Sequence, residues 1–317
     1  MVQVAILGFG VVGKGVYELV QENQDTVAKQ VGAGVNIGKV LVRTWPTAEW
    51  EQSLFTQDFQ QILNDSNIRV VVEAMGGLDP ALAYTKALLE AGKHVVTSNK
   101  ELVAVHGEEL EAVAQKHGVR YLYEASVGGG IPIIRPLQQC LAANEITEIY
   151  GILNGTTNYI LTQMKEKGQN FDDALKSAQE RGYAEADPTA DVEGHDTQRK
   201  ISILASLAFG TQVPVDSIST KGISALTVSD LEAAENDGQS IKLIGHAKLE
   251  NGQVVAKVEP MKLSKNSPLA NVGDVFNAIV VQANPLGEVM FYGQGAGAKP
   301  TASAVMADVI HIAKDIA

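Results

Sequence analysis

The sequence of 317 residues predicts an α/β fold in the first part of the chain and an α+β fold in the second. Three observations support this prediction. Short β-branched runs alternate with helical patterns up to about residue 130, which is typical of parallel β-α-β units. Later, two apolar runs flank Asn251-Gly252, a strong signal for an antiparallel hairpin. The length also suits two domains of roughly 100–200 residues each.

The elements of the first part follow from local patterns. Val2 to Leu7 is a β-branched run that predicts a buried strand, followed by a helical segment that extends to about Lys29. Asp79-Pro80 predicts a helix start, with Asp79 as the N-cap and Pro80 in the first turn. The other elements are expected as strands at 38–43, 69–74, 94–97 and 120–124, and as helices at 58–63, 80–92 and 101–117.

The second part mixes longer helices with paired strands. Ile131-Pro132 is expected to open a helix, and a glycine-rich turn at 293–297 leads to a final helix from Pro300. Further helices are expected at 156–167, 172–181 and 196–209, and strands at 146–153, 242–249, 254–263, 276–283 and 289–292.

Composition argues against several functional classes. The net charge of −12 argues against a nucleic-acid partner, which needs an extended basic face. No apolar run approaches the roughly 20 residues of a membrane span, and no signal-peptide pattern follows Met1. Cys140 is the single cysteine, which fits a reducing cytoplasm. We expect Cys140 to be a small buried hydrophobe, with a catalytic thiol as the alternative.

Residues 8–13 read Gly-Phe-Gly-Val-Val-Gly between a predicted strand and a predicted helix, the context that the dinucleotide fingerprint requires. Gly8 permits the tight turn, Gly10 lets the backbone approach a pyrophosphate, and Gly13 allows close helix–strand packing. The helix N-terminus adds partial positive charge. A glycine turn with a purely structural role is the alternative. We predict a Rossmann-type domain whose cofactor site includes Gly8, Phe9, Gly10, Val11, Val12 and Gly13.

The end of the second predicted strand bears on the identity of the cofactor. An NAD site usually places Asp or Glu there to bind the ribose diol. Residues 39–44 read Lys-Val-Leu-Val-Arg-Thr and contain no carboxylate, whereas Arg43 could pair with a 2′-phosphate. NADP is therefore preferred over NAD, unless Arg43 is only a solvated residue at the strand end.

Two lysines and a group of carboxylates predict a reaction site. Lys100 follows the strand at 94–97, and ligands bind at the carboxyl edge of an open parallel sheet. Asp196 and Lys200 are four residues apart and share one helix face. The residues after Lys200 are apolar, so desolvation would lower its pKa and let it donate a proton near neutral pH. The alternatives are a solvated surface lysine at position 100 and a solvated acidic loop at 185–196.

Several segments of the sequence resemble those of a known family. The segment from Ala178 to Lys200 resembles the homoserine dehydrogenase signature at every fixed position. The matching residues are Ala178, Gly182-Tyr183-Ala184, Asp187-Pro188, Asp191-Val192, Gly194, Asp196 and Lys200. Further similar segments occur in order at 8–13, 97–100, 124–132, 153–160 and 295–303. The resemblance covers essentially the whole chain.

The resemblance implies NAD(P)-dependent interconversion of L-homoserine and L-aspartate 4-semialdehyde, in the aspartate-derived pathway to threonine and methionine. Lys200 and Lys100 resemble the catalytic lysine pair, accompanied by Asp196. The implied substrate-binding residues are Glu185, Asp191, Thr156 and Lys200. The implied cofactor site adds Arg43, Gly76, Ser98, Lys100 and Gly297 to the glycine loop. A monovalent cation site for Na⁺ or K⁺ is implied at Glu124 with the backbone carbonyls of Val127, Gly129 and Ile131.

Family membership also implies an organisation. The family is typically dimeric through its central sheet, and its last helix returns to the nucleotide domain. We therefore expect a cytoplasmic homodimer with a dinucleotide-binding domain at 1–130 and 295–317, and a catalytic and dimerisation domain at 131–294. Because many members carry a C-terminal ACT domain, a chain that ends at Ala317 looks like a short form. The rival functions are a dehydrogenase for another small aldehyde or amino acid, and a non-catalytic NADP sensor.

Overall fold

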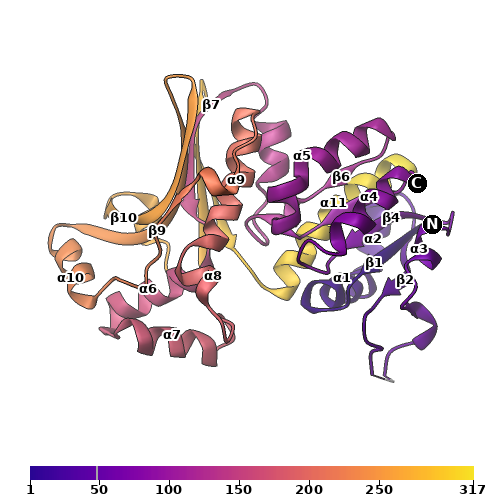
Figure 1. Ribbon diagram of the computed structural model, residues 1–317, viewed down its shortest axis with the longest axis horizontal. Coiled ribbons are helices and arrows are strands. Elements are labelled where there is room, and N and C mark those ends of the chain that lie inside the picture. Colours follow the sequence, from indigo (N-terminus) through magenta and orange to yellow (C-terminus); the bar gives the residue numbers. More distant parts are fainter. Residues whose placement is uncertain (48) are drawn as a thin grey trace. The chain divides into compact units, whose positions relative to one another are not determined.

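The computed structural model describes residues 1–47 and 49–317 and divides them into two compact units (Figure 1). Unit 1 comprises Met1–Gly130 and Gly297–Ala317, and unit 2 comprises Ile131–Ala296. The chain thus passes from unit 1 to unit 2 after Gly130 and returns to unit 1 after Ala296.

Unit 1 is built on a six-stranded sheet in the order β3-β2-β1-β4-β5-β6, and all its strand pairs are parallel. The strands are β1 (Val2–Leu7), β2 (Val35–Leu41), β3 (Phe55–Thr56), β4 (Ile68–Glu73), β5 (His94–Thr97) and β6 (Tyr121–Leu122). The strand order reverses beside β1. In doubly wound sheets, dinucleotides bind in the crevice outside the strand carboxyl ends at this switch point.

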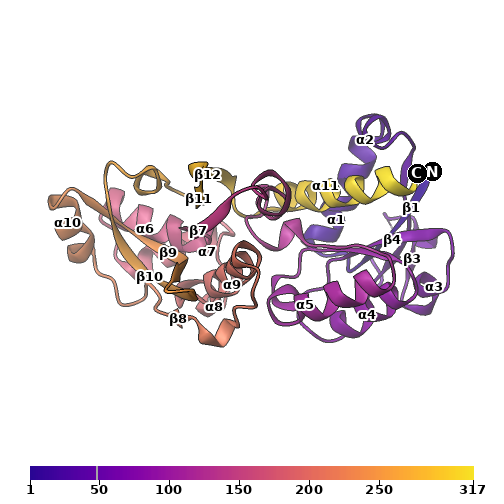
Figure 2. The same ribbon diagram turned by 90° about the horizontal axis from the view of Figure 1, so that it is seen from above.

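Helices surround this sheet. They are α1 (Val11–Glu22), α2 (Gln24–Val31), α3 (Gln60–Leu63), α4 (Ala81–Glu90), α5 (Lys100–Lys116) and α11 (Ala298–Ile316). The final helix α11 lies beside α1, as both ribbon views show (Figure 2). Gly15 makes this packing possible, because a Cβ there would lie 3.0 Å from the Ala298 carbonyl oxygen. Val305 and Val309 of α11 are buried in the core that β1 and β4 share.

Three local predictions in unit 1 need correction. The helix expected to reach Lys29 is interrupted at Asn23, where the backbone leaves helical geometry and α2 begins afresh. Asp79 is not an N-cap, because α4 starts after Pro80 and has no side-chain cap. The strand expected at 120–124 ends at Leu122, because a 3₁₀ turn takes up Glu124–Ser126.

Unit 2 contains a six-stranded mixed sheet in the order β12-β11-β7-β9-β10-β8. Its strands are β7 (Glu145–Ile152), β8 (Ser219–Thr220), β9 (Gln239–Glu250), β10 (Gln253–Ser264), β11 (Phe276–Asn284) and β12 (Gly287–Gln294). β8 pairs with β10 in parallel and the other neighbours are antiparallel. The hairpin between β9 and β10 is confirmed, with Asn251 and Gly252 both at positive φ (53° and 79°).

The helices of unit 2 are α6 (Gly155–Lys167), α7 (Phe171–Glu180), α8 (Thr189–Val192), α9 (His195–Phe209) and α10 (Val228–Asn236). Helix α9 packs closely on β9, since a Cβ at Gly245 would lie 3.0 Å from the Thr197 side chain. The sequence reasoning missed α10, although Thr227 and Asp230 form a capping box that marks its start. No helix within residues 1–47 and 49–317 is long and apolar enough to cross a membrane.

The prediction for Cys140 is wrong. Ile131-Pro132 does not open a helix; helical structure starts at Ile134 and continues as a π-helical turn, Pro136–Cys140. Leu137 and Leu141 occupy the buried face of this segment, at 5% and 6% exposure. Cys140 lies off that face and is exposed. The apolar residues around Cys140 gave no indication of the π-helical turn, which changes the side of the helix on which Cys140 lies.

Lys242 on β9 is a buried cation in unit 2. Its Nζ donates hydrogen bonds to Asn158 Oδ1 at 3.0 Å and to the Val272 carbonyl oxygen. Burial, followed by the nearby charge of Lys165, lowers the pKa of Lys242 to about 8, although Glu166 acts in the opposite direction. Lys242 therefore releases its proton in the folded chain well before it would in the unfolded chain.

This lowered pKa predicts a pH-dependent contribution to stability. Between pH 8 and pH 10.5 the unfolded chain binds more protons at this position, so the contribution of Lys242 to stability rises with pH. The free energy of unfolding of the parent minus that of Lys242→Met should increase by about 1–2 kcal/mol from pH 7 to 9.5. Urea unfolding of both proteins at the two pH values measures it. A constant difference would contradict the lowered pKa.

Candidate active site

The glycine loop of unit 1 has the geometry of a dinucleotide cradle. A Cβ at Gly13 would lie 2.1 Å from the Gly8 carbonyl oxygen, and Gly8 itself has φ +95°. By contrast, nothing lies within 4 Å of a Cβ at Gly10. Gly10 is the N-cap of α1, and it leaves the helix start without a side-chain cap or an acidic first turn. The open flank and uncapped helix N-terminus fit the pyrophosphate of a dinucleotide.

Phe9 is held by an aromatic cluster. Its ring makes edge contacts with Trp50, Phe55 and Tyr17 at centroid distances of 4.9, 5.0 and 6.1 Å. The side chain of Phe9 therefore anchors the loop, and its backbone is the part suited to a cofactor. The neighbouring Val11 is 68% exposed.

Arg43 lies beside the end of β2. The strand ends at Leu41, whose carbonyl oxygen accepts a hydrogen bond from Gly8 N at 2.9 Å. Arg43 is exposed two residues later, and its own carbonyl accepts a hydrogen bond from Gln57 Nε2 at 2.7 Å. Its backbone is tethered next to the strand that meets the glycine loop.

The remaining expected cofactor residues of unit 1 follow strand ends or precede a helix. Gly76 is exposed at φ +77° in the turn after β4, and Gly297 is the N-cap of α11 at φ +123°. Ser98 N donates to the Glu73 carbonyl oxygen at 3.4 Å. Lys100 is half-buried at the first position of α5, directly after the capping residue Asn99.

Unit 2 holds the second lysine in a buried ion pair. Lys200 Nζ lies 2.7 Å from Asp196 Oδ2 and 2.8 Å from the Leu153 carbonyl oxygen. Lys200 is 8% exposed and Asp196 is 3% exposed. The prediction that these residues share one helix face at the edge of a buried region is confirmed. A buried charge pair of this kind interacts more strongly than one at the surface.

Asn154 is a residue of this site that the sequence reasoning did not single out. Its Nδ2 donates to Asp191 Oδ1 at 2.7 Å and to Asp196 Oδ2 at 2.9 Å. Its Oδ1 accepts from Thr157 N at 2.8 Å and caps α6. Asn154 therefore joins Asp191 to the ion pair of Asp196 and Lys200. The sequence offered one indication of this residue. Asn154 stands between a predicted strand and a predicted helix, where Asn is a favoured N-cap.

The other expected substrate residues of unit 2 differ in their surroundings. Thr156 is buried, and its Oγ1 donates to the Tyr183 carbonyl oxygen at 2.6 Å, which ties α6 to the acidic loop. Glu185 is exposed, and its backbone carbonyl accepts from Gln179 Nε2 at 3.1 Å. The structure thus gathers Asp191, Asp196 and Lys200 into one network and leaves Glu185 at the surface.

The expected cation ligands lie near Gly130, where the first segment of unit 1, Met1–Gly130, ends. Glu124 is 3% exposed, and its backbone N donates to Asp308 Oδ2 at 2.8 Å. Val127 and Gly129 are buried, with Gly129 at φ +56°, and Ile131 is the first residue of unit 2. In the part of the chain that the structure describes, no group of three His, Cys, Asp or Glu side chains could hold a metal. The expected site combines Glu124 with the backbone carbonyls of Val127, Gly129 and Ile131, and oxygen ligands suit a hard cation.

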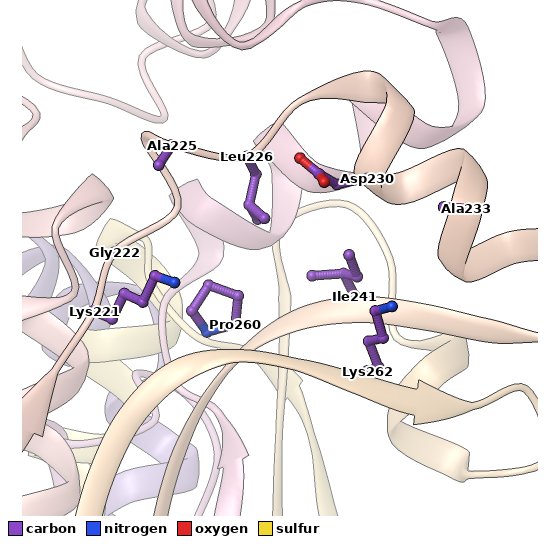
Figure 3. Close-up of a pocket in the computed structure, with 9 residues that line it drawn as sticks. All are labelled: Lys221, Gly222, Ala225, Leu226, Asp230, Ala233, Ile241, Pro260 and Lys262. Atoms are coloured by element: carbon purple, nitrogen blue, oxygen red, sulfur yellow. The ribbon is translucent and has the colours of Figure 1, made fainter.

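A pocket of about 340 Å³ lies elsewhere in unit 2 (Figure 3). Its lining residues come from α10, β9, β10 and the segment 221–226, and Lys221, Leu226 and Pro260 point into it. None of the expected substrate residues lines this pocket. The pocket and the predicted site are formed by different residues.

Two family models match this chain. Residues 132–310 match the family model "Homoserine dehydrogenase", and residues 8–124 match "Homoserine dehydrogenase, NAD binding domain". The chain belongs to the homoserine dehydrogenase family. It has NAD(P)-dependent homoserine dehydrogenase activity, within the aspartate family of amino-acid biosynthesis.

Individual relatives are similar over nearly the whole chain. A homoserine dehydrogenase of Lactococcus lactis is 44% identical over 99% of this chain and 74% of the relative. A crystal structure of a homoserine dehydrogenase from Thiobacillus denitrificans has a TM-score of 0.94 at 41% identity, covering 99% of this chain and 73% of that one. A hyperthermophilic archaeal homoserine dehydrogenase in complex with NADPH has a TM-score of 0.83 at 28% identity, covering 98% and 97%. The fold class predicted from the sequence is confirmed.

Proposed function

We propose that Lys200 moves the proton in the interconversion of L-homoserine and L-aspartate 4-semialdehyde. When bound, NADP(H) supplies or accepts the hydride. Aldehyde reduction leaves an alkoxide-like oxygen, which needs a proton and a nearby positive charge. The buried ammonium of Lys200, held 2.7 Å from Asp196 Oδ2, suits both needs. The network that Asn154 extends to Asp191 is the observation that carries this proposal. In homoserine oxidation, Lys200 accepts the hydroxyl proton.

Lys100 is proposed as the second lysine of the reaction. Its position after β5, at the carboxyl edge of the parallel sheet, supports a role beside the nicotinamide cofactor.

The proposed reaction as a whole is tested by measuring the rate of homoserine oxidation with NADP and, separately, with NAD. Absence of homoserine-dependent turnover with either cofactor would overturn the proposal.

Glu185 is proposed to bind the substrate ammonium. Its exposure supports this role, because an incoming amino acid must reach the carboxylate from solvent. Glu185→Gln should raise the KM for homoserine about 10- to 100-fold, the effect of a charged hydrogen bond, with little change in kcat. Steady-state kinetics measure this, with Glu180→Gln as the control for loss of a nearby exposed acid. An unchanged KM would remove Glu185 from the substrate site.

Arg43 is proposed to favour NADP by pairing with its 2′-phosphate. Its place beside the strand that meets the glycine loop supports this role. Arg43→Ala should raise the KM for NADP about tenfold or more and leave the KM for NAD nearly unchanged. Lys39→Ala, which removes a nearby cation that lies on β2 itself, is the matched control. Equal losses with both cofactors, or a parent enzyme that prefers NAD, would contradict it.

Two further properties are proposed. A monovalent cation would be held by Glu124 and the carbonyls of Val127, Gly129 and Ile131. Activity that is equal in K⁺, Na⁺ and tetramethylammonium salts would contradict this cation site.

The chain is proposed to form a homodimer through the sheet of unit 2. Met290 and Tyr292 on β12, at 40% and 54% exposure, offer apolar surface for such contact. A monomer mass in sedimentation at assay concentration would contradict the dimer.

A further inference from the structure

Glu73 is a buried carboxylate at the last position of β4, and none of the roles above uses it. It is 0% exposed. It accepts hydrogen bonds from Thr97 Oγ1 at 2.6 Å and from Met75 N at 2.7 Å. The backbone N–H of Gly76 and the side-chain amide of Asn99 also favour its charged form. Burial raises the pKa of Glu73, and each of these donors acts to lower it.

These donors come from the last residue of β5 and from the loops that follow β4 and β5 at the carboxyl edge of the sheet. Thr97 Oγ1 accepts from Asn99 N at 2.9 Å, and Asn99 Nδ2 donates to the Gly77 carbonyl oxygen at 2.6 Å. Asn99 Oδ1 in turn accepts from Leu102 N and caps α5. Since Lys100 is the first residue of α5, its backbone position depends on Asn99, and through Thr97 on Glu73.

The loop after β4 also touches the glycine loop. Ala74 N donates to the Leu7 carbonyl oxygen at 2.8 Å. A Cβ at Gly8 would lie 2.7 Å from the Ala74 carbonyl oxygen, so the two turns are in direct contact. The carboxylate of Glu73 therefore links the turn at Gly76 to the start of α5, and the backbone of the adjoining Ala74 contacts the turn at Gly8.

We infer that Glu73 is a positioning residue that holds Lys100 and the turn at Gly76 in the geometry that the reaction needs. The inference rests on the role proposed for Lys100. A carboxylate only accepts hydrogen bonds, so it can hold these converging donors at once. Glutamine of the same shape brings a donor of its own and would oppose one of them. Burying a carboxylate without a partner is costly, and here the hydrogen bonds that offset the cost come from the end of β5 and the loop after β4.

The first test is Glu73→Gln, assayed well below its melting temperature. We expect kcat to fall about 10- to 100-fold, as for a catalytic group displaced by about 1 Å, and the KM for NADP to rise. The KM for homoserine should stay unchanged, because the expected substrate residues belong to unit 2. A folded variant with the parent kcat and the parent KM for NADP would overturn the inference.

A matched pair at position 97 tests the same link without altering the carboxylate. Thr97→Val keeps the shape of the side chain but removes the hydroxyl that joins Glu73 to Asn99. Thr97→Ser keeps that hydroxyl. We expect Thr97→Val to reproduce the kinetic defect of Glu73→Gln and Thr97→Ser to retain the parent kinetics. Equal kinetics for the two variants would contradict the link.

A double-mutant cycle separates this inference from the proposed function. If Glu73 acts through Lys100, Glu73→Gln should lower kcat no further in a Lys100→Met background. Effects that multiply would show that Glu73 acts independently and would overturn the inference. A Lys100→Met enzyme with parent kinetics would refute the role proposed for Lys100. In that case the KM for NADP of Glu73→Gln alone decides whether Glu73 positions the cofactor turn.

Discussion

Replacing Lys200 by methionine is expected to lower kcat for homoserine oxidation by about 10²- to 10⁴-fold, the usual contribution of a general acid or base. The substitution removes the ammonium that lies 2.7 Å from Asp196 Oδ2 and leaves a carboxylate of 3% exposure without this cation. Cofactor binding should be largely retained, because the glycine loop belongs to unit 1. Steady-state kinetics together with NADPH fluorescence titration measure both expectations.

Lys242→Met is the matched control for this experiment. Lys242 is also a buried lysine of unit 2, at 5% exposure, but it hydrogen-bonds to Asn158 and Val272 rather than to the acidic network. It should retain kcat within a few-fold, even where its stability changes. If Lys200→Met kept a kcat near that of the parent, Lys200 would not be the proton-transfer group. Arginine at position 200 should not restore activity, since it stays protonated at accessible pH.

Substituting alanine for Gly13 is expected to abolish cofactor binding and to cost about 1–3 kcal/mol or more of stability. The new Cβ would lie 2.1 Å from the Gly8 carbonyl oxygen and 3.3 Å from Ile6 Cγ2. Gly8 cannot move aside, because its own turn is packed against Ala74. Either α1 or the turn must shift, and the helix N-terminus moves with it.

Gly10→Ala provides the contrasting variant. Nothing lies within 4 Å of a Cβ at this position, so the stability should change by less than about 1 kcal/mol. NADPH binding should still weaken strongly, since the methyl group would fill the flank that the pyrophosphate approaches. Urea unfolding and NADPH titration of both variants separate the two effects. Undiminished NADPH affinity in Gly10→Ala would place the pyrophosphate elsewhere.

Local patterns determined much of the fold. The β-branched run at Val2–Leu7 and the strand His94–Thr97 form at their expected bounds, because short β-branched runs favour the strand conformation locally. The hairpin at Asn251-Gly252 follows from turn chemistry. In the same way, the four-residue spacing of Asp196 and Lys200 was enough to place both on one face of α9.

Only the tertiary structure decided which distant groups meet. Asn154 reaches Asp191 and Asp196 across 37 and 42 residues, and Glu73 reaches Thr97 across 24. Periodicity carries no information about such pairings, since they depend on how strand ends and loops pack after the chain has folded. Cys140 shows the same limit. The apolar residues around it predicted burial, but a π-helical turn gave the buried face to Leu137 and Leu141.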